Sequence, residues 1–122
     1  MHGLHLTADL QGCAGGAAMR DPAALRERCL AAVAASGLTA VGELFHAFPG
    51  EGGVTGVVLL AESHLAVHTW PELGAVTLDA YVCNFGADNS ARAEALIAFL
   101  VEAFAPAQVA RQRLRRGESP GP

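Results

Sequence analysis

Short segments with the apolar or alternating pattern typical of β-strands recur along the whole chain. They cover residues 3–10, 38–48, 54–61, 64–70, 75–83 and 108–114, the last of them predicted as an edge strand. Two intervening segments rich in glycine, residues 11–19 and 49–53, are predicted as a loop and a flexible turn. The hydrophobic pattern therefore predicts a sheet of six strands.

The first of two predicted helices begins at Asp21, because Asp is a common N-cap and Pro22 suits the first helical position. Its end is predicted at Gly37, since glycine is common just past the last helical residue. The apolar residues between these ends recur every four positions on one face: Leu25, Cys29 and Val33. One side of this helix is therefore expected to be buried, with Cys29 in the core.

A second helix is predicted after residues 88–90, whose Asp, Asn and Ser side chains are all suited to an N-cap. Pro106 is expected to stop this helix, because proline cannot continue the hydrogen-bonding pattern. Its apolar stripe consists of Ala93, Leu96, Ile97, Leu100, Val101 and Phe104. Like the first helix, it has one face to bury.

The order of the elements, β-α-β-β-β-β-α-β, predicts an α+β fold. Two helices with one apolar face each most simply cover one face of a single, mostly antiparallel sheet, which gives a two-layer α/β sandwich. The other face of the sheet must also be covered, so we expect a homodimer with sheets inside and helices outside, in αββα order. Residues 1–116 are predicted to form one domain, and residues 117–122 a disordered tail.

Of the 122 residues, 52% are hydrophobic and 16% are charged, which favours burial of surface against a partner chain. The formal net charge of -4 argues against nucleic acid or an anionic membrane as a partner. No apolar run approaches the ~20 residues of a membrane-spanning helix and no signal peptide is recognised, so we expect a cytoplasmic protein. Cys13, Cys29 and Cys83 are expected to be free thiols, and no metal site is predicted from the spacing of the five histidines.

Candidate chemistry is concentrated in residues 61–72, where a Ser, two His, two Glu and a Trp interrupt a strand-like sequence. His64 and His68 alternate with apolar residues, so both imidazoles are expected on one face of the strand. Ser63 lies at the junction with the preceding strand. A hydroxyl, carboxylates and imidazoles at one strand junction indicate a reactive site, although the sequence leaves open whether His64 takes part or only packs. The other histidines are expected to be solvated surface residues: His2, His5 and His46.

A longer motif consists of Gly53-Val54-Thr55-Gly56, Glu62-Ser63-His64-Leu65, His68-Thr69-Trp70-Pro71-Glu72, Asp79 and Cys83. This motif resembles the small prokaryotic S-adenosylmethionine decarboxylases, which carry a pyruvoyl group made from their own chain. The resemblance is close over residues 45–83, and outside that span only the order of elements matches. It implies the αββα dimer and autocatalytic cleavage between Glu62 and Ser63, which divides the chain into residues 1–62 and 63–122. Ser63 would then become the pyruvoyl group that forms a Schiff base with the substrate.

The chain contains no lysine, which excludes a pyridoxal phosphate cofactor bound through lysine. The resemblance assigns His68 as the base during cleavage and the Thr55 hydroxyl as the group that stabilises the oxyanion. It assigns Cys83 as the acid that reprotonates the α-carbon of the substrate after carbon dioxide leaves. An ordinary thiol has a pKa of about 8.5 and is largely protonated at neutral pH, as this role requires.

The resemblance also implies S-adenosylmethionine as the substrate, whose decarboxylated product donates aminopropyl groups in spermidine synthesis. Phe48 and Trp70 would offer aromatic surface to the adenine ring and the sulfonium cation. Glu72 would bind the ribose hydroxyl groups.

Two departures from the family keep other functions open. The turn between Phe48 and Thr55 is two residues longer than the family pattern, and Asn84-Phe85-Gly86 follows Cys83 where the family commonly has Gly. A pyruvoyl-dependent decarboxylase of a basic amino acid, ornithine or arginine, is therefore an alternative. A third possibility is an uncleaved homologue that binds a ligand without catalysis.

Overall fold

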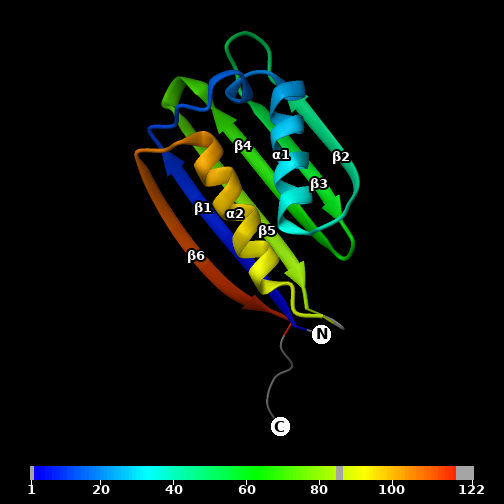
Figure 1. Ribbon diagram of the computed structural model, residues 1–122. Coiled ribbons are helices and arrows are strands. Elements are labelled where there is room, and N and C mark those ends of the chain that lie inside the picture. Colours follow the sequence, from blue (N-terminus) through cyan, green and yellow to red (C-terminus); the bar gives the residue numbers. More distant parts are fainter. Residues whose placement is uncertain (1, 85–86, 118–122) are drawn as a thin grey trace.

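In residues 2–84 and 87–117, which this computed structural model describes, the predicted strands form one six-stranded sheet with both helices on one face (Figure 1). The strands are β1 (Gly3–Gln11), β2 (Ala40–Ala47), β3 (Val54–Leu60), β4 (Ser63–Trp70), β5 (Ala75–Cys83) and β6 (Gln108–Arg116); the helices are α1 (Pro22–Ser36) and α2 (Ser90–Phe104). The predicted α+β sandwich of one sheet layer and one helix layer is confirmed. The tail predicted over residues 117–122 lies outside the described residues apart from Gly117.

The strand order is β2-β3-β4-β5-β1-β6, and each neighbouring pair among the described residues is antiparallel. Strands β2 to β5 follow one another across the sheet, and β1 then pairs with β5 on its other side. In Figure 1, β1 and β6 lie side by side although they come from opposite ends of the chain. The last strand is at an edge of the sheet, as predicted.

The alternating strands separate an apolar face, which packs under the helices, from a more polar face. The buried apolar residues of the sheet are Leu4, Leu6, Ala8, Leu10, Val54, Val58, Leu60, Leu65, Val67, Val76, Leu78, Ala80 and Val82. Those of the helices are Leu25, Cys29, Ala32, Val33, Ala93, Leu96, Ile97, Leu100 and Phe104. The predicted apolar stripes are thus confirmed, except that Val101 is only partly buried. Burial raises the pKa of the Cys29 thiol to about 12, so this cysteine is a core residue, as predicted.

An aspartate just before each helix accepts a backbone hydrogen bond from its first turn. The Asp21 carboxylate accepts the Ala23 N–H at 3.0 Å, and Gly37 ends α1 with φ of 85°. In α2, the Asp88 carboxylate accepts the Ser90 N–H at 2.9 Å. Each helix has 15 residues, and no helix in the described part of the chain is long and apolar enough to cross a membrane.

The structure corrects the prediction of a loop over residues 11–19. This segment contains a short 3-10 helix, η1 (Gly16–Met19), in which Met19 is buried. The Met19 carbonyl accepts a hydrogen bond from the Thr69 hydroxyl at 2.8 Å, which attaches this turn to β4. Four residues are too few to show a helical period, so the sequence pattern did not reveal the turn. A second short turn, η2 (Pro71–Leu73), follows β4.

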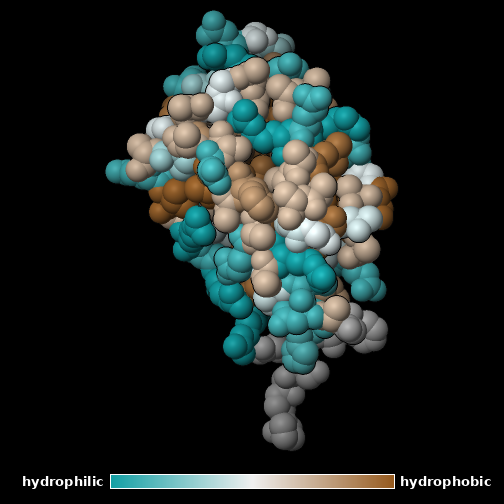
Figure 2. Space-filling view, viewed as in Figure 1, coloured by the Kyte–Doolittle hydropathy of each residue, from teal (hydrophilic) through white to brown (hydrophobic). Residues whose placement is uncertain are grey.

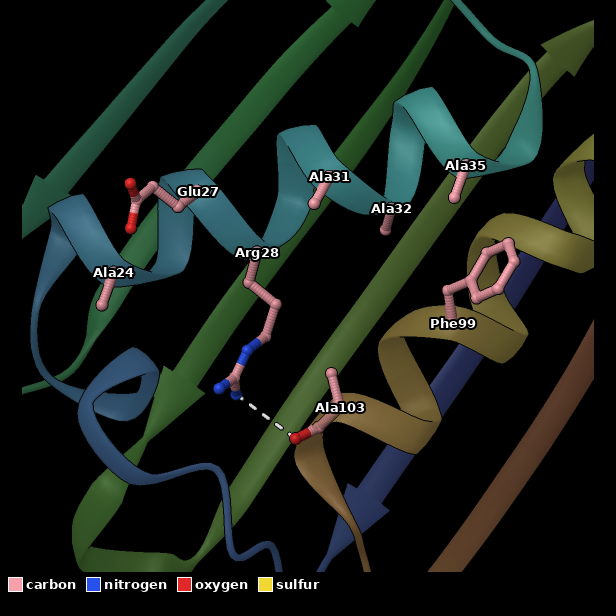
Figure 3. Close-up of a pocket in the computed structure, with 8 residues that line it drawn as sticks. All are labelled: Ala24, Glu27, Arg28, Ala31, Ala32, Ala35, Phe99 and Ala103. Carbon is pink, nitrogen blue, oxygen red and sulfur yellow. Dashed lines mark hydrogen bonds between the residues drawn. The ribbon is translucent and has the colours of Figure 1, made fainter.

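The outer surface of the helix layer has a groove between α1 and α2 (Figure 3). Arg28 crosses it, donating to the carbonyls of Gly15 at 2.9 Å and Ala103 at 3.3 Å, with its guanidinium over the Phe104 ring. Viewed from this side, the molecule has apolar residues across its middle and polar residues toward both ends (Figure 2). Arg28 therefore joins the two helices. The groove is also lined by Ala24, Glu27, Ala31, Ala32, Ala35 and Phe99.

We expect Phe104→Ala to lower the free energy of unfolding by about 3–5 kcal/mol, because it removes a fully buried ring and leaves a cavity. Phe99 is the matched control, since it lies on the same helix but is 42% exposed. Its replacement by Ala should cost less than about 1 kcal/mol. Urea denaturation in a Ser63→Ala background, which keeps the chain in one piece, measures both. Equal losses in the two variants would contradict this description of the core.

Candidate active site

The face of the sheet away from the helices carries the two histidines predicted on β4. On β4, which lies between β3 and β5 (Figure 1), Leu65 and Val67 are buried toward the helices. His64, Ala66 and His68 alternate with them on the opposite, open face and are half-buried. The prediction that both histidines share one face of a strand is confirmed.

His68 forms a hydrogen-bonded pair with Thr55 of the neighbouring strand. The two residues lie directly opposite each other in the β3–β4 register, and Thr55 Oγ1 is 3.0 Å from His68 Nδ1. The His68 ring also stacks on Trp70, with ring centroids 5.9 Å apart and an interplanar angle of 29°. The hydroxyl and the indole thus hold the imidazole in one orientation, which a proton-transferring group requires.

A cavity of about 370 Å³ adjoins this pair and collects the predicted substrate-binding residues. Phe48 enters from the turn after β2, and Trp70 and Glu72 from the end of β4 and from η2. Phe48 reaches the cavity although the turn that follows it is longer than the family pattern. The full lining is Phe48, Gly52, Gly53, Thr55, His68, Thr69, Trp70 and Glu72.

Three residues of this cavity were not predicted as site residues from the sequence: Gly52, Gly53 and Thr69. A Cβ atom on Gly53 would overlap the Thr69 carbonyl, so only glycine allows the backbones to approach this closely. The Thr69 hydroxyl accepts the Val54 N–H at 2.8 Å and is buried. In the sequence, the consecutive glycines Gly52 and Gly53 were the available sign of this close approach. Two glycines in a row are also typical of an ordinary flexible turn.

The predicted cleavage site lies at the tight connection between β3 and β4. Leu60 and Ser63 are opposite each other in the ladder, so only Ala61 and Glu62 make the turn. Glu62 has φ of 57°, a left-handed conformation that favours Gly or Asn. Ser63 follows directly, and its Oγ accepts the backbone N–H of Cys83 at 3.2 Å. Glu62, Ser63 and Cys83 therefore form one cluster, with a strained residue at the predicted scissile bond.

The predicted residues thus form two clusters instead of one. Ser63 and His68 are five residues apart on the same strand, which at the usual rise places them roughly 16 Å apart. The first cluster holds the cleavage site, and the second holds the proposed base and the cavity. Within one chain, the His68 imidazole does not reach the Ser63 hydroxyl.

Between the two clusters, the open face carries paired polar groups. His5 Nε2 lies 2.9 Å from Asp79 Oδ1, and the rings of His64 and Tyr81 stack with centroids 5.7 Å apart. The expectation that His5 is solvated is wrong, because its side chain is only 23% exposed and pairs with Asp79. The alternation of His5 with the apolar Leu4 and Leu6 was the signal for its place on the open face. His46 and His2 are exposed, as predicted.

Neither metal chemistry nor a disulfide is indicated by the side chains that the structure describes. Among these residues, no group of three or more His, Cys, Asp and Glu could hold a metal ion. The described residues include all three cysteines, and each is a free thiol. Burial raises the pKa of Cys13, which lies in the loop before η1.

Comparison with known proteins shows which family this chain resembles. Residues 4–117 match the model of the S-adenosylmethionine decarboxylase family. The S-adenosylmethionine decarboxylase proenzyme of Symbiobacterium thermophilum is 38% identical over 116 residues, which are 95% of this chain and 83% of that protein. The proenzyme of Aquifex aeolicus is 36% identical over 115 residues, 94% of this chain and 81% of that protein.

A solved structure has the same fold. The crystal structure of the adenosylmethionine decarboxylase from Aquifex aeolicus VF5 superposes with a TM-score of 0.85 at 34% identity. The superposition covers 97% of this chain and 92% of that chain. With a family match over nearly its whole length and relatives of this similarity, the chain belongs to the S-adenosylmethionine decarboxylase family.

Proposed function

We propose that this protein cleaves itself between Glu62 and Ser63 and then decarboxylates S-adenosylmethionine with a pyruvoyl group made from Ser63. The product would be the aminopropyl donor of polyamine synthesis. The observation that carries the proposal is the left-handed Glu62 directly before a serine whose Oγ accepts the Cys83 N–H. Family membership supports the same activity.

Cleavage would begin with attack of the Ser63 hydroxyl on the Glu62 carbonyl carbon. The peptide C–N bond breaks and an ester bond forms, while the hydroxyl proton passes to a base and then to the released amine. A base next removes the α-proton of Ser63, and the Cβ–Oγ bond breaks, which releases Glu62 as a carboxylate. The dehydroalanine left at position 63 takes up water and loses ammonia, which leaves the pyruvoyl group.

Local strain and one backbone donor favour these steps. A left-handed conformation costs an ordinary residue about 1–2 kcal/mol, and breaking the peptide bond releases Glu62 from it. The Cys83 N–H already binds Ser63 Oγ, and this same oxygen leaves with the Glu62 carboxylate during elimination. A donor in place before the reaction can stabilise the negative charge that develops there.

Once formed, the pyruvoyl group supplies the electron sink that decarboxylation of an α-amino acid requires. Cys83, at the end of β5 beside position 63, would then give a proton to the α-carbon of the substrate. Phe48 and Trp70 are 49% and 37% exposed and can cover an adenine ring or a sulfonium cation. Glu72, on the rim of the same cavity, is suited to bind ribose hydroxyl groups.

We further infer that two copies of the chain complete each site. The Thr55–His68 pair and the cavity lie roughly 16 Å from Ser63 in one chain, too far for proton transfer. The open face also carries exposed leucines, at 71% for Leu44, 51% for Leu59 and 56% for Leu114, which a second sheet could cover. Face-to-face packing in a homodimer would bury them.

The register of the strands indicates how the copies would align. Val57, Ala66, Asp79 and Thr7 form a row across the middle of the open face. A two-fold axis lying between the sheets and along this row would invert the strand direction of the partner. Ser63 lies three residues to one side of Ala66 and His68 two residues to the other. The end of each β4 that carries Ser63 would therefore lie opposite the His68 end of the partner's β4. The free thiols are compatible with a reducing cytoplasmic location, which we also propose.

We expect freshly made protein to convert from one chain into fragments of residues 1–62 and 63–122, because a left-handed Glu62 directly precedes a serine whose Oγ accepts the Cys83 N–H. Intact mass measurement over time follows the conversion and tests for a blocked terminus on the second fragment. Ser63→Ala should remain a single chain, since it lacks the attacking hydroxyl. A wild-type chain that stays whole after long incubation counts against the proposed function and leaves the uncleaved homologue as the better description.

We expect His68→Ala alone to stay uncleaved, but to be cleaved when co-expressed with Ser63→Ala. In the mixed dimer, the His68→Ala chain supplies Ser63 and the Ser63→Ala chain supplies His68, so one composite site is complete. Differently tagged chains separated by gel electrophoresis show which of them is cut. If co-expression yields no cleaved chain, the two-copy site is wrong, although cleavage within one chain could still occur in the wild type.

We expect the cleaved protein to release labelled carbon dioxide from S-adenosylmethionine and not from ornithine or arginine, because its cavity offers aromatic surface for adenine. Trp70→Ala should lower kcat/KM about tenfold or more through lost ring contacts. Cys83→Ala should still cleave but turn over at least about a hundredfold more slowly, as expected when a positioned proton donor is removed. Release from ornithine or arginine alone would establish the alternative substrate and retain the cleavage chemistry.

A further inference from the structure

Asn89 occupies the N-cap position of α2, but its side chain is used elsewhere. Within the described part of the chain, it makes no capping hydrogen bond to the start of the helix. Its Nδ2 instead donates to the backbone carbonyl of Cys83 at 2.9 Å. Asp88 provides the cap, through its carboxylate and the Ser90 N–H, and this contact holds the pKa of Asp88 below its ordinary value. The helix is therefore capped without Asn89.

Other polar groups fix the orientation of the Asn89 amide. The Arg92 guanidinium donates to Asn89 Oδ1 at 2.8 Å, which directs the amide NH₂ group toward β5. The backbone N–H of Asn89 donates to Asn84 Oδ1 at 2.8 Å, and Asn84 Nδ2 donates to Ser90 Oγ at 3.2 Å. The end of β5 and the start of α2, neighbours in Figure 1, are thus tied together by side-chain amides.

A single residue, Cys83, connects these hydrogen bonds to the cleavage site. The carbonyl of Cys83 accepts from Asn89, and the N–H of Cys83 donates to Ser63 Oγ. The amide of Asn89 thereby fixes the backbone on which both the Ser63 hydroxyl and the Cys83 thiol depend. Asn89 is half-buried, so water competes only in part for this bond.

We propose that Asn89 is a positioning residue for self-cleavage, acting through the Cys83 backbone to hold Ser63 Oγ in place for attack. This inference rests on the proposed function. The amide of Asn84 helps to place Asn89, because its Oδ1 accepts the Asn89 N–H. An error of about 1 Å in the position of a reacting group can cost a hundredfold in rate, so one hydrogen bond at this point is sufficient to matter.

The sharpest test is Asn89→Asp, which keeps an oxygen for Arg92 and leaves the Asp88 cap in place but loses the N–H donor to Cys83. We expect cleavage of newly translated precursor, followed by gel electrophoresis in a cell-free pulse-chase, to slow about tenfold or more. Asn89→Ala should slow it similarly. Thermal unfolding of Asn89→Asp in the Ser63→Ala background should occur within about 3 °C of the parent, because the cap is retained.

Asp88→Ala is the matched control, because it removes the cap of the same helix without touching Cys83. We expect a lower unfolding temperature and an unchanged rate of cleavage. Wild-type cleavage rates for both Asn89 variants would overturn the inference, as would equal slowing in Asp88→Ala, which would assign the effect to helix stability. A wild-type precursor that never cleaves would instead contradict the proposed function itself.

Discussion

The hydrogen-bonded register of β4 with its two neighbours is the constraint on which the candidate site depends. It places Thr55 opposite His68 and His64 opposite Tyr81. Because successive side chains alternate, a slip of one residue would turn both histidines toward the helices and expose the buried apolar residues of β4. The hydrophobic core therefore fixes the register, and the register fixes which polar groups meet on the open face.

The same packing can hold the strained turn at the cleavage site. A left-handed Glu62 costs about 1–2 kcal/mol, whereas burying one leucine such as Leu65 or Leu60 contributes about 1.5–3 kcal/mol. Several buried residues flank the turn on β3 and β4, so the fold outweighs the local penalty by a wide margin. A residue in a strained conformation next to a nucleophile can thus persist in a stable domain without destabilising it as a whole.

The open face combines apolar and paired polar groups in a way that suits burial against a second sheet. His5 and Asp79 are already hydrogen-bonded to each other, with Nε2 and Oδ1 2.9 Å apart. This contact lowers the free-energy cost of removing the two side chains from water. Exposed leucines on β2, β3 and β6 lie on the same face and supply apolar area. A partner sheet would cover both kinds of group, and it would also bring together the two clusters of the candidate site.

The sequence by itself determined the strands, the two helices, their buried faces and the chemical identity of the motif. Alternation, helical spacing and the Glu62-Ser63 string are local properties of the chain, and local patterns record which side of an element is buried. The sequence also identified the residues of the cavity that lie near the motif, Phe48, Trp70 and Glu72. It missed η1, because a four-residue turn has no period to detect.

Only the tertiary structure decided which of these residues meet. The left-handed φ of Glu62 results from a two-residue connection between two registered strands. The pairing of His5 with Asp79 and the bond from Asn89 to Cys83 join segments whose contact depends on strand order and on the path of a connection. The separation of Ser63 from the Thr55–His68 pair follows from the straight course of β4, because a motif read along the sequence gives spacing but not distance.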